Sequence, residues 1–317
     1  MSDRNDDAAI RALLAEAGLP ADRTVRIEPV GGGTYNAVHR VVPPEGPRLV
    51  IKRPPPAAAP AMTYEQGLPA AEALYYELVA RHTTVPVPEV VRLSGEWLLM
   101  TECPGRPWHE ARPAPADEPR LRRELGALVA RVHRITGTVF GYPSRPAADW
   151  RTAFGGMLEA VLSDADRYAA RLPVPTGRIR ALAAAAAPVL DEVTVPVPVH
   201  FDLWEGNVLL TGAGADTRIG ALIDGERMFW GDPIADFVSL QLLGDPDDDP
   251  DLLRGYGIDG FSESESLRLA LYQTYLYLIM LVEAVPRGCP PGHHDWLRQD
   301  VAPRLTAALV DVETYGG

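Results

Sequence analysis

Residues 200–207 read HFDLWEGN, and the segment ALIDG follows at 221–225. The first segment has the form H-x-D-x-x-x-x-N, and the second ends an apolar run with the carboxylate of Asp224. Transfer of a phosphoryl group from a nucleotide requires a carboxylate that orients the attacking hydroxyl. It also requires an amide and a second carboxylate that hold Mg²⁺ on the phosphates. Short motifs recur by chance, but the two segments together favour phosphoryl-transfer chemistry.

The residues between these segments predict a β-hairpin. An apolar run at 208–210 is followed by a turn-rich stretch at 211–217 and a second strand-like run at 218–223. The open ends of an antiparallel hairpin lie together. Asn207 precedes the first strand and Asp224 closes the second, so the hairpin would place two candidate metal ligands at the same end.

Two more residues of the first segment have predicted roles. Asp202 lies in the loop that leads into the hairpin, five residues before Asn207. This position allows its carboxylate to face a substrate hydroxyl while Asn207 faces the metal. His200 is expected to organise the loop, with its ring bonded to nearby backbone groups.

The distribution of basic residues singles out one position. The chain has 30 lysine and arginine residues, and Lys52 is its only lysine. An ammonium group is a compact point charge, unlike the planar guanidinium, so this bias indicates a position that requires lysine. Lys52 ends the strand-like run 48–52, and kinases use a lysine on such a strand to hold the α- and β-phosphates. Alone, it reads better as a solvated strand-end residue; beside the downstream motif, the phosphate-binding role is favoured.

A glycine-rich turn separates two strand-like runs upstream of this lysine. It contains Gly31, Gly32, Gly33 and Thr34. Glycines allow backbone N–H groups to approach phosphate oxygens without a clash from Cβ. The turn is not a Walker A loop, because no Gly-Lys-Ser/Thr follows, and it does not match GxGxxG. A phosphate-binding loop and a plain hairpin turn are equally good interpretations of this segment alone.

A helix predicted over residues 68–80 carries a candidate partner for the lysine. Its apolar residues recur at helical spacing. Glu72 lies at the edge of the apolar stripe, whereas Glu77 falls on the opposite face. Because a carboxylate on the next helix positions the phosphate-binding lysine of kinases, we expect Glu72 to pair with Lys52. The alternative is an acidic residue in the first turn that is favoured by the helix dipole.

The chain resembles the aminoglycoside phosphotransferase family of small-molecule kinases, which are relatives of the protein-kinase fold. The resemblance spans roughly residues 25–240 in the order of the family. The matching pieces are the glycine turn 31–36, Lys52, the helix with Glu72, the segment 125–133 (LGALVARVH), the segment 200–207, Ile223-Asp224 and the segment 231–236 (GDPIAD).

The resemblance implies a role for each of these pieces. Asp202 would be the catalytic base, and Asn207 and Asp224 would be the Mg²⁺ ligands. Lys52 would hold the phosphates of ATP. The nucleotide would be ATP, with GTP not excluded.

The resemblance also implies a hinge at residues 100–105, where Glu102 and Cys103 would place their backbone against adenine. Asp232 and Asp236 would brace the catalytic loop.

The chain departs from the family pattern at two places. Phe201 stands where glycine is common, and Gly225-Glu226 follow the metal-ligand aspartate in place of Phe-Gly. The D-L-W-x-G-N form is also similar to fructosamine kinases. These features leave the acceptor open.

Length and composition agree with an α+β, bilobal, protein-kinase-like fold. The 317 residues exceed one ordinary domain, and 46% of them are hydrophobic, which is ample for a buried core. We expect a β-rich N-terminal lobe over residues 1–102 that binds nucleotide, and a mainly helical C-terminal lobe over 103–317 that binds substrate. Beyond the helix with Glu72, helices are predicted at 7–17, 118–135, 150–171, 176–190, 263–285 and 295–313.

The distribution of charge along the chain indicates which class of molecule the protein binds. From residue 200 onward there are 20 acidic residues against 7 arginines, so this half carries the whole net charge of −13. No basic face is evident, which disfavours nucleic acid as a partner. A cationic acceptor, such as an aminoglycoside or another amine-bearing antibiotic, would be attracted. The run 245–251 (DPDDDPD) is interpreted as a solvated acidic loop and is left out of this argument.

Other features predict a cytoplasmic protein with no membrane partner, as a monomer or homodimer. No uncharged apolar stretch of membrane-spanning length is present, and the N-terminus lacks a signal-peptide pattern. Two cysteines, Cys103 and Cys289, lie far apart, so a disulfide framework is not expected.

Four functional hypotheses are compared at this point. The leading one is an ATP- and Mg²⁺-dependent O-phosphotransferase that modifies an antibiotic. The second is a metabolic kinase for a sugar, a fructosamine or an amino alcohol. A nucleotide-binding pseudokinase or scaffold is disfavoured, because the base, the lysine and both metal ligands are present. A protein kinase is disfavoured too, because no Ala-Pro-Glu segment follows Asp224.

Overall fold

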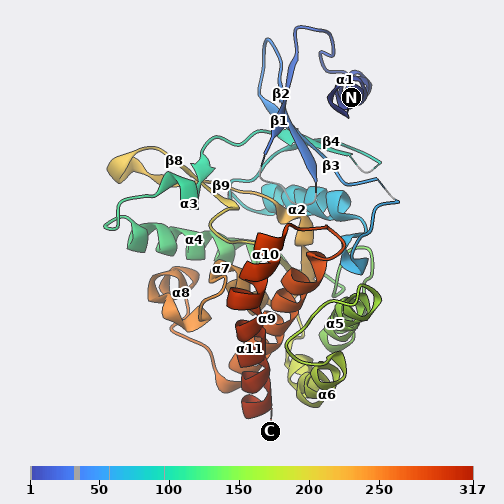
Figure 1. Cartoon of the computed structure of the whole chain (residues 1–317). Coiled ribbons are helices and arrows are strands. Elements are labelled where there is room, and N and C mark those ends of the chain that lie inside the picture. Colours follow the sequence, from blue (N-terminus) through green and yellow to red (C-terminus); the bar gives the residue numbers. More distant parts are fainter. Residues whose placement is uncertain (1, 32–35, 57, 96, 317) are drawn as a thin grey trace.

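A five-stranded antiparallel sheet forms the N-terminal part of the chain (Figure 1). The computed structural model describes residues 2–31, 36–56, 58–95 and 97–316. The strands lie in the order β1-β2-β3-β5-β4. Their bounds are β1 (Arg26–Val30), β2 (Ala37–Val42), β3 (Leu49–Arg53), β4 (Val90–Ser94) and β5 (Trp97–Thr101).

The two faces of this sheet pack against different helices. Successive side chains of a strand point to opposite faces. In β5, Leu99 therefore packs against α1 (Ser2–Glu16) in a small core of its own. Leu98 and Met100 belong instead to the main core, together with α2 (Leu68–His82). The alternation thus sandwiches the sheet between the two helices.

Helices make up most of the C-terminal part. The longest is α9 (Glu263–Glu283), which is buried over most of its length. It packs against α5 (Trp150–Arg167) and α11 (Ala302–Tyr315). A second pair, α4 (Glu118–Val132) and α8 (Pro250–Tyr256), approaches closely. Gly126 makes this approach possible, because a Cβ there would lie 2.2 Å from the carbonyl oxygen of Leu252.

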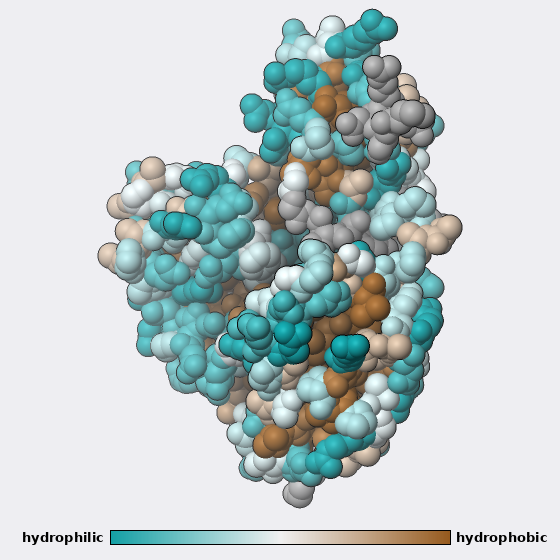
Figure 2. All heavy atoms as spheres, viewed as in Figure 1, coloured by the Kyte–Doolittle hydropathy of each residue, from teal (hydrophilic) through white to brown (hydrophobic). Residues whose placement is uncertain are grey.

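Short elements join these parts. A three-stranded sheet contains β6 (Arg106–Pro107), β8 (Val208–Thr211) and β9 (Arg218–Leu222), and a two-stranded sheet pairs β7 (Val197–Val199) with β10 (Phe229–Gly231). The remaining helices are α3 (Trp108–Ala111), α6 (Thr176–Ala186), α7 (Phe237–Leu240) and α10 (Pro291–Trp296). Figure 2 shows hydrophilic residues over most of one face, with apolar residues among them along α9, α10 and α11.

The α+β class and the division into a β-rich and a helical part are confirmed, and two helix predictions need correction. The helix predicted over 176–190 ends at Ala186, and a 3-10 segment that contains Pro188 follows it. The helix predicted over 295–313 is two helices joined by a π segment at 297–301 just before Pro303. In both cases a proline lacks the N–H that a continuous α-helix needs.

The acidic run 245–251, interpreted as a solvated loop, is exposed at Asp245, Asp247 and Asp248 but is not a plain loop, and Asp249 is not solvated. It forms a 3-10 turn and then the start of α8. Asp249 is buried, and its carboxylate accepts a hydrogen bond from Leu252 N at 2.9 Å as the N-cap of this helix. Asp249 also lies 3.5 Å from Nε of Arg122. Among the helices of the described residues, none is long and apolar enough to span a membrane.

Candidate active site

The predicted hairpin is present and joins the two motif segments. β8 and β9 are antiparallel, with Val208 opposite Leu222. Ile223 N donates to the carbonyl of Asn207 at 2.9 Å, so the ladder continues one step beyond the strands. Asn207 and Asp224 consequently lie at the same end of the hairpin.

The loop before the hairpin is held by its own polar side chains. Asn207 Nδ2 donates to the carbonyl of Asp202 at 2.7 Å. His200 Nε2 donates to the carbonyl of Ile223 at 2.9 Å, while its Nδ1 accepts from Asp202 N at 3.3 Å. Burial lowers the pKa of His200, in keeping with a neutral ring that accepts at one nitrogen and donates at the other. The expectation that His200 organises this loop is confirmed.

The carboxylate of Asp236 holds the backbone of this loop in place. It accepts from His200 N at 3.2 Å and from Phe201 N at 2.7 Å, and its other contact is His133 Nε2 at 2.9 Å. The same role was expected of Asp232, and that expectation is wrong.

Asp232 serves α9 instead. Its Oδ2 accepts from Arg268 Nε and from the Tyr272 hydroxyl, each at 2.8 Å. It therefore ties the segment after β10 to the central helix.

Two residues of the motif adopt left-handed backbone conformations. Phe201 has φ 60°, and Asp224 has φ 65°. Positive φ values are rare for residues other than glycine, and they are least favourable for a residue with a bulky side chain. Phe201 is also fully buried, with its ring 5.0 Å from that of Phe229 and 5.5 Å from that of Tyr275. Phe201 thus combines backbone strain with aromatic packing.

Lys52 joins the sheet to the hairpin. Its Nζ lies 2.7 Å from Glu72 Oε1 and 3.0 Å from Oε2, and it also donates to Asp224 Oδ1. Burial on its own would lower the pKa of Lys52, but the Asp224 and Glu72 carboxylates outweigh burial and raise it. The ammonium group is therefore a fixed positive charge.

Glu72 lies deeper than its predicted position at the edge of an apolar stripe. It is fully buried, and the Tyr76 hydroxyl donates to its Oε1 at 2.7 Å. The same hydroxyl accepts from Asp224 N at 2.8 Å. One tyrosine thus connects the carboxylate of α2 with the end of the hairpin, and burial raises the pKa of Glu72.

Glu226 is a site residue that the motif analysis noted only as a departure from the family pattern. Its Oε2 lies 3.8 Å from Lys52 Nζ and accepts from Asn36 Nδ2. Ligand oxygens of Glu72, Asp224 and Glu226 all lie within 4.8 Å of one another. Burial and the nearby Asp224 raise the pKa of Glu226 to about 8. The signal in the sequence was an acidic residue two positions after Asp224.

Gly225, between these two acids, is required by close packing. A Cβ at this position would lie 2.7 Å from the ring of Tyr75 on α2. The turn after the hairpin and α2 therefore contact each other directly, which keeps Glu72 close to Asp224 and Glu226.

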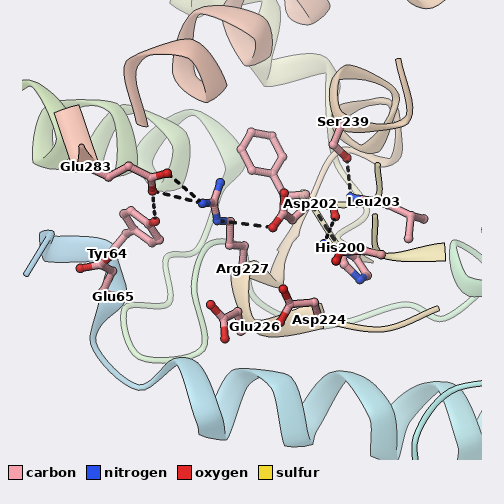
Figure 3. A network of polar contacts seen from close by, with 12 residues as sticks. Tyr64, Glu65, His200, Asp202, Leu203, Asp224, Glu226, Arg227, Ser239 and Glu283 are labelled. Atoms are coloured by element: carbon pink, nitrogen blue, oxygen red, sulfur yellow. Dashed lines mark hydrogen bonds and ion pairs between the residues drawn. The ribbon is translucent and has the colours of Figure 1, made fainter. Parts of the chain in front are cut away.

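Arg227 is the second residue that the motif analysis missed, and it borders the candidate base (Figure 3). Its Nε lies 3.9 Å from Asp202 Oδ2, and its Nη2 lies 3.1 Å from Glu283 Oε2 on α9. The Tyr64 hydroxyl donates to the same Glu283 oxygen at 2.8 Å. Burial raises the pKa of Asp202 to about 7, although the Arg227 charge opposes this shift.

The predicted nucleotide contacts are only partly described. Gly31 is exposed after β1, whereas Gly32, Gly33 and Thr34 lie outside the described residues. 

In the predicted hinge, Glu102 N donates to the carbonyl of Arg48 at 2.9 Å, so this N–H is already used within the N-terminal part. Its carboxylate accepts from Arg40 Nε. Burial raises the pKa of the Cys103 thiol to about 11, as expected of a packed rather than a reactive cysteine.

Solved structures of phosphotransferases have the same architecture. A candidate fructosamine-3-kinase of Thermobifida fusca is 22% identical with a TM-score of 0.67, and the match covers 96% of this chain and 98% of that one. The macrolide 2'-phosphotransferase MphH of Brachybacterium faecium is 20% identical with a TM-score of 0.59, covering 93% and 98%. The aminoglycoside phosphotransferase APH(2")-IIa in its gentamicin complex is 15% identical with a TM-score of 0.62, covering 96% and 95%. These likenesses show the fold.

A sequence comparison shows the family. No curated protein matches the chain. The model of the phosphotransferase enzyme family matches residues 26–271, which include the glycine turn, Lys52, the hairpin and Asp236. The chain belongs to this family and is a small-molecule phosphotransferase.

Proposed function

We propose that the protein transfers the γ-phosphoryl group of Mg-ATP to a hydroxyl of a small molecule. The nucleotide would bind between the lobes formed by residues 1–102 and 103–317. The observation that carries the proposal is the convergence of Lys52 and the hairpin end. The one lysine of the chain lies against Asp224, and Asp202 lies in the loop that Asn207 ties to the same hairpin.

The side chains around Asp224 suit a hard cation. Carboxylate and amide oxygens are the ligands that Mg²⁺ prefers. Asn207 uses its Nδ2 on the Asp202 carbonyl, so its Oδ1 is the atom left to coordinate. Asn207 and Asp224 would hold the ion, with Glu226 as an additional oxygen donor nearby. When bound, Mg²⁺ would neutralise charge on the phosphates.

The protein residues would then orient the acceptor. Asp202 would accept the proton of the acceptor hydroxyl, because its carboxylate lies in the loop before the hairpin and burial raises its pKa to about 7, near the pH at which a general base works. Lys52 stabilises charge on the phosphates. Gly31, Gly32, Gly33 and Thr34 would cover the phosphates. The backbone of Glu102 and Cys103 would contact adenine, with the Glu102 carbonyl and the Cys103 N–H as the groups to test.

We propose an amine-bearing antibiotic as the acceptor. The acidic surplus of the C-terminal half supports a cationic acceptor, and gentamicin is bound in one similar structure. A metabolic acceptor is the second candidate, because the D-L-W-x-G-N segment and the Thermobifida fusca structure both point to fructosamine-type substrates. A pseudokinase would release no ADP at all.

The test is ADP release from Mg-ATP with pools of aminoglycosides, macrolides, fructosamines, sugars and amino alcohols. Asp202→Asn removes the base. Asp216→Asn is the matched control, because Asp216 is exposed in the hairpin turn away from the loop. Pool-dependent release that disappears only in Asp202→Asn supports the proposal and names the acceptor class. Full activity of Asp202→Asn would overturn the assignment of the base.

A further inference from the structure

A cavity lies away from the phosphotransfer residues. It has a volume of about 730 Å³ and opens between the C-terminal ends of α2 and α4. Small-molecule pockets have volumes in this range. Four cationic or titratable residues line it, namely Arg81, His82, Arg131 and Arg134, together with three threonines. None of the described residues that line it is acidic.

The arginines of this cavity lack carboxylate partners. Arg81, Arg131 and Arg134 are exposed, and none of the three forms an ion pair with a carboxylate of the described residues. Arg131 Nη1 instead donates to the Thr84 hydroxyl at 3.4 Å. The chain as a whole has 43 acidic and 30 basic residues, so this cluster has the opposite charge to the rest of the protein.

The C-terminal ends of the two helices offset only part of the positive charge of the three arginines. A helix C-terminus carries roughly half a negative charge and favours a cation nearby. The ends of α2 and α4 together therefore offset about one of the three arginine charges. About two positive charges remain without a partner, and like charges repel unless an anion lies between them.

We propose that this cavity binds a small polyanion, a molecule with two or more phosphate or carboxylate groups. The guanidinium fork pairs with both groups through two parallel hydrogen bonds. The threonine hydroxyls add neutral donors to the same wall. The site lies at the opposite end of α2 from Glu72, so binding here does not depend on phosphotransfer.

Calorimetric titration of the full chain with inorganic pyrophosphate, and separately with citrate, tests the proposal in the absence of Mg²⁺. The pocket variant carries Arg81→Gln, Arg131→Gln and Arg134→Gln. Wild type is expected to bind at least one probe with a Kd of about 1 mM or lower. The pocket variant should weaken this binding by at least about tenfold, since charge-assisted hydrogen bonds are lost. The two probes distinguish phosphate from carboxylate ligands.

The control variant carries Arg92→Gln, Arg171→Gln and Arg218→Gln, which are exposed arginines elsewhere. It has the same net charge as the pocket variant, and it should bind within about twofold of wild type. Any affinity of pyrophosphate for the nucleotide site is common to both variants and cancels. Absence of binding by wild type, or equal binding by the two variants, overturns the proposal. Because all six arginines are exposed, thermal unfolding should be unchanged, and that measurement verifies folding.

Discussion

Arg227 Nε lies 3.9 Å from Asp202 Oδ2, and the guanidinium is buried between that carboxylate and Glu283. A permanent positive charge thus stands beside the candidate base. Glu283 fixes the guanidinium from α9, and Tyr64 fixes Glu283 from the segment before α2. The orientation of Asp202 therefore depends on three segments that are distant in sequence.

This arrangement predicts that Arg227→Gln lowers kcat about tenfold to a hundredfold while changing the KM for ATP little. The acceptor hydroxyl would meet a less firmly oriented carboxylate, whereas Lys52 would still hold the phosphates. Arg227→Lys keeps the charge and should recover part of the activity. The measurement is steady-state kinetics with the acceptor identified from the pools.

Arg218→Gln is the control for this experiment, because Arg218 is exposed on β9. Its kinetics should equal those of wild type. Equal losses of kcat in Arg227→Gln and Arg227→Lys would show that charge beside Asp202 is not what matters.

Replacing Lys52 should destabilise the protein, because the carboxylates around it would lose their compensating charge. Lys52→Met leaves Glu72, Asp224 and Glu226 close together without the ammonium group, so we expect a loss of about 3 kcal/mol of unfolding free energy. Adding Glu72→Gln removes one uncompensated buried charge. The double variant should therefore be more stable than Lys52→Met alone. Urea denaturation measures both values, and a double variant that is less stable than the single one contradicts this account.

Asp202 should make the stability of the nucleotide-free protein depend on pH. Its pKa rises from 3.8 in the unfolded chain to about 7 in the folded one. Below about pH 4 the carboxyl is neutral in both states, and above about 7 the folded protein carries a buried charge. The cost of that charge begins near the unfolded pKa and grows until the pH passes the folded one. Asp202→Asn removes the charge, so its stabilising effect should be larger at pH 8 than at pH 5 by on the order of 2 kcal/mol.

Thermal unfolding of wild type, Asp202→Asn and the exposed control Asp216→Asn at both pH values measures this effect. The control should show the same difference from wild type at pH 5 and pH 8. A stabilisation by Asp202→Asn that is equal at the two pH values would mean that burial of the charge is not its origin.

The local parts of the site could be predicted from sequence, and the parts made by distant contacts could not. The hairpin between Asn207 and Asp224 follows from a short turn and two apolar runs. The Lys52–Glu72 pair followed from a kinase pattern, although the full burial of Glu72 did not, because helical spacing alone does not show what packs above a helix. Arg227 is held beside Asp202 by an ion pair with Glu283, which lies 56 positions away in the sequence. The sequence pattern of neither segment predicts that contact.

The proline-containing helices show the same limit. Apolar spacing continues through residues 176–190 and 295–313, so one helix was expected in each. The local effect of Pro188 and Pro303 on backbone hydrogen bonding interrupts both. The acidic run 245–251 was misread because Asp249 is both a helix cap and a partner of Arg122. Only the second of these contacts depends on the tertiary fold, so the cap could have been found.

Phe201 offers a test of the strain in the catalytic loop. Its left-handed backbone costs about 1–2 kcal/mol, while its buried ring contributes more, since Phe→Ala in a core costs about 3–5 kcal/mol. Phe201→Gly and Phe201→Ala should therefore both destabilise the protein by several kcal/mol. Because glycine adopts φ 60° without a Cβ penalty, the glycine variant should be more stable than the alanine variant by about 1 kcal/mol. At an ordinary helical or extended position the order would be reversed. Urea denaturation of the two variants gives this difference directly, and alanine ranking above glycine would show that the loop stores no such strain.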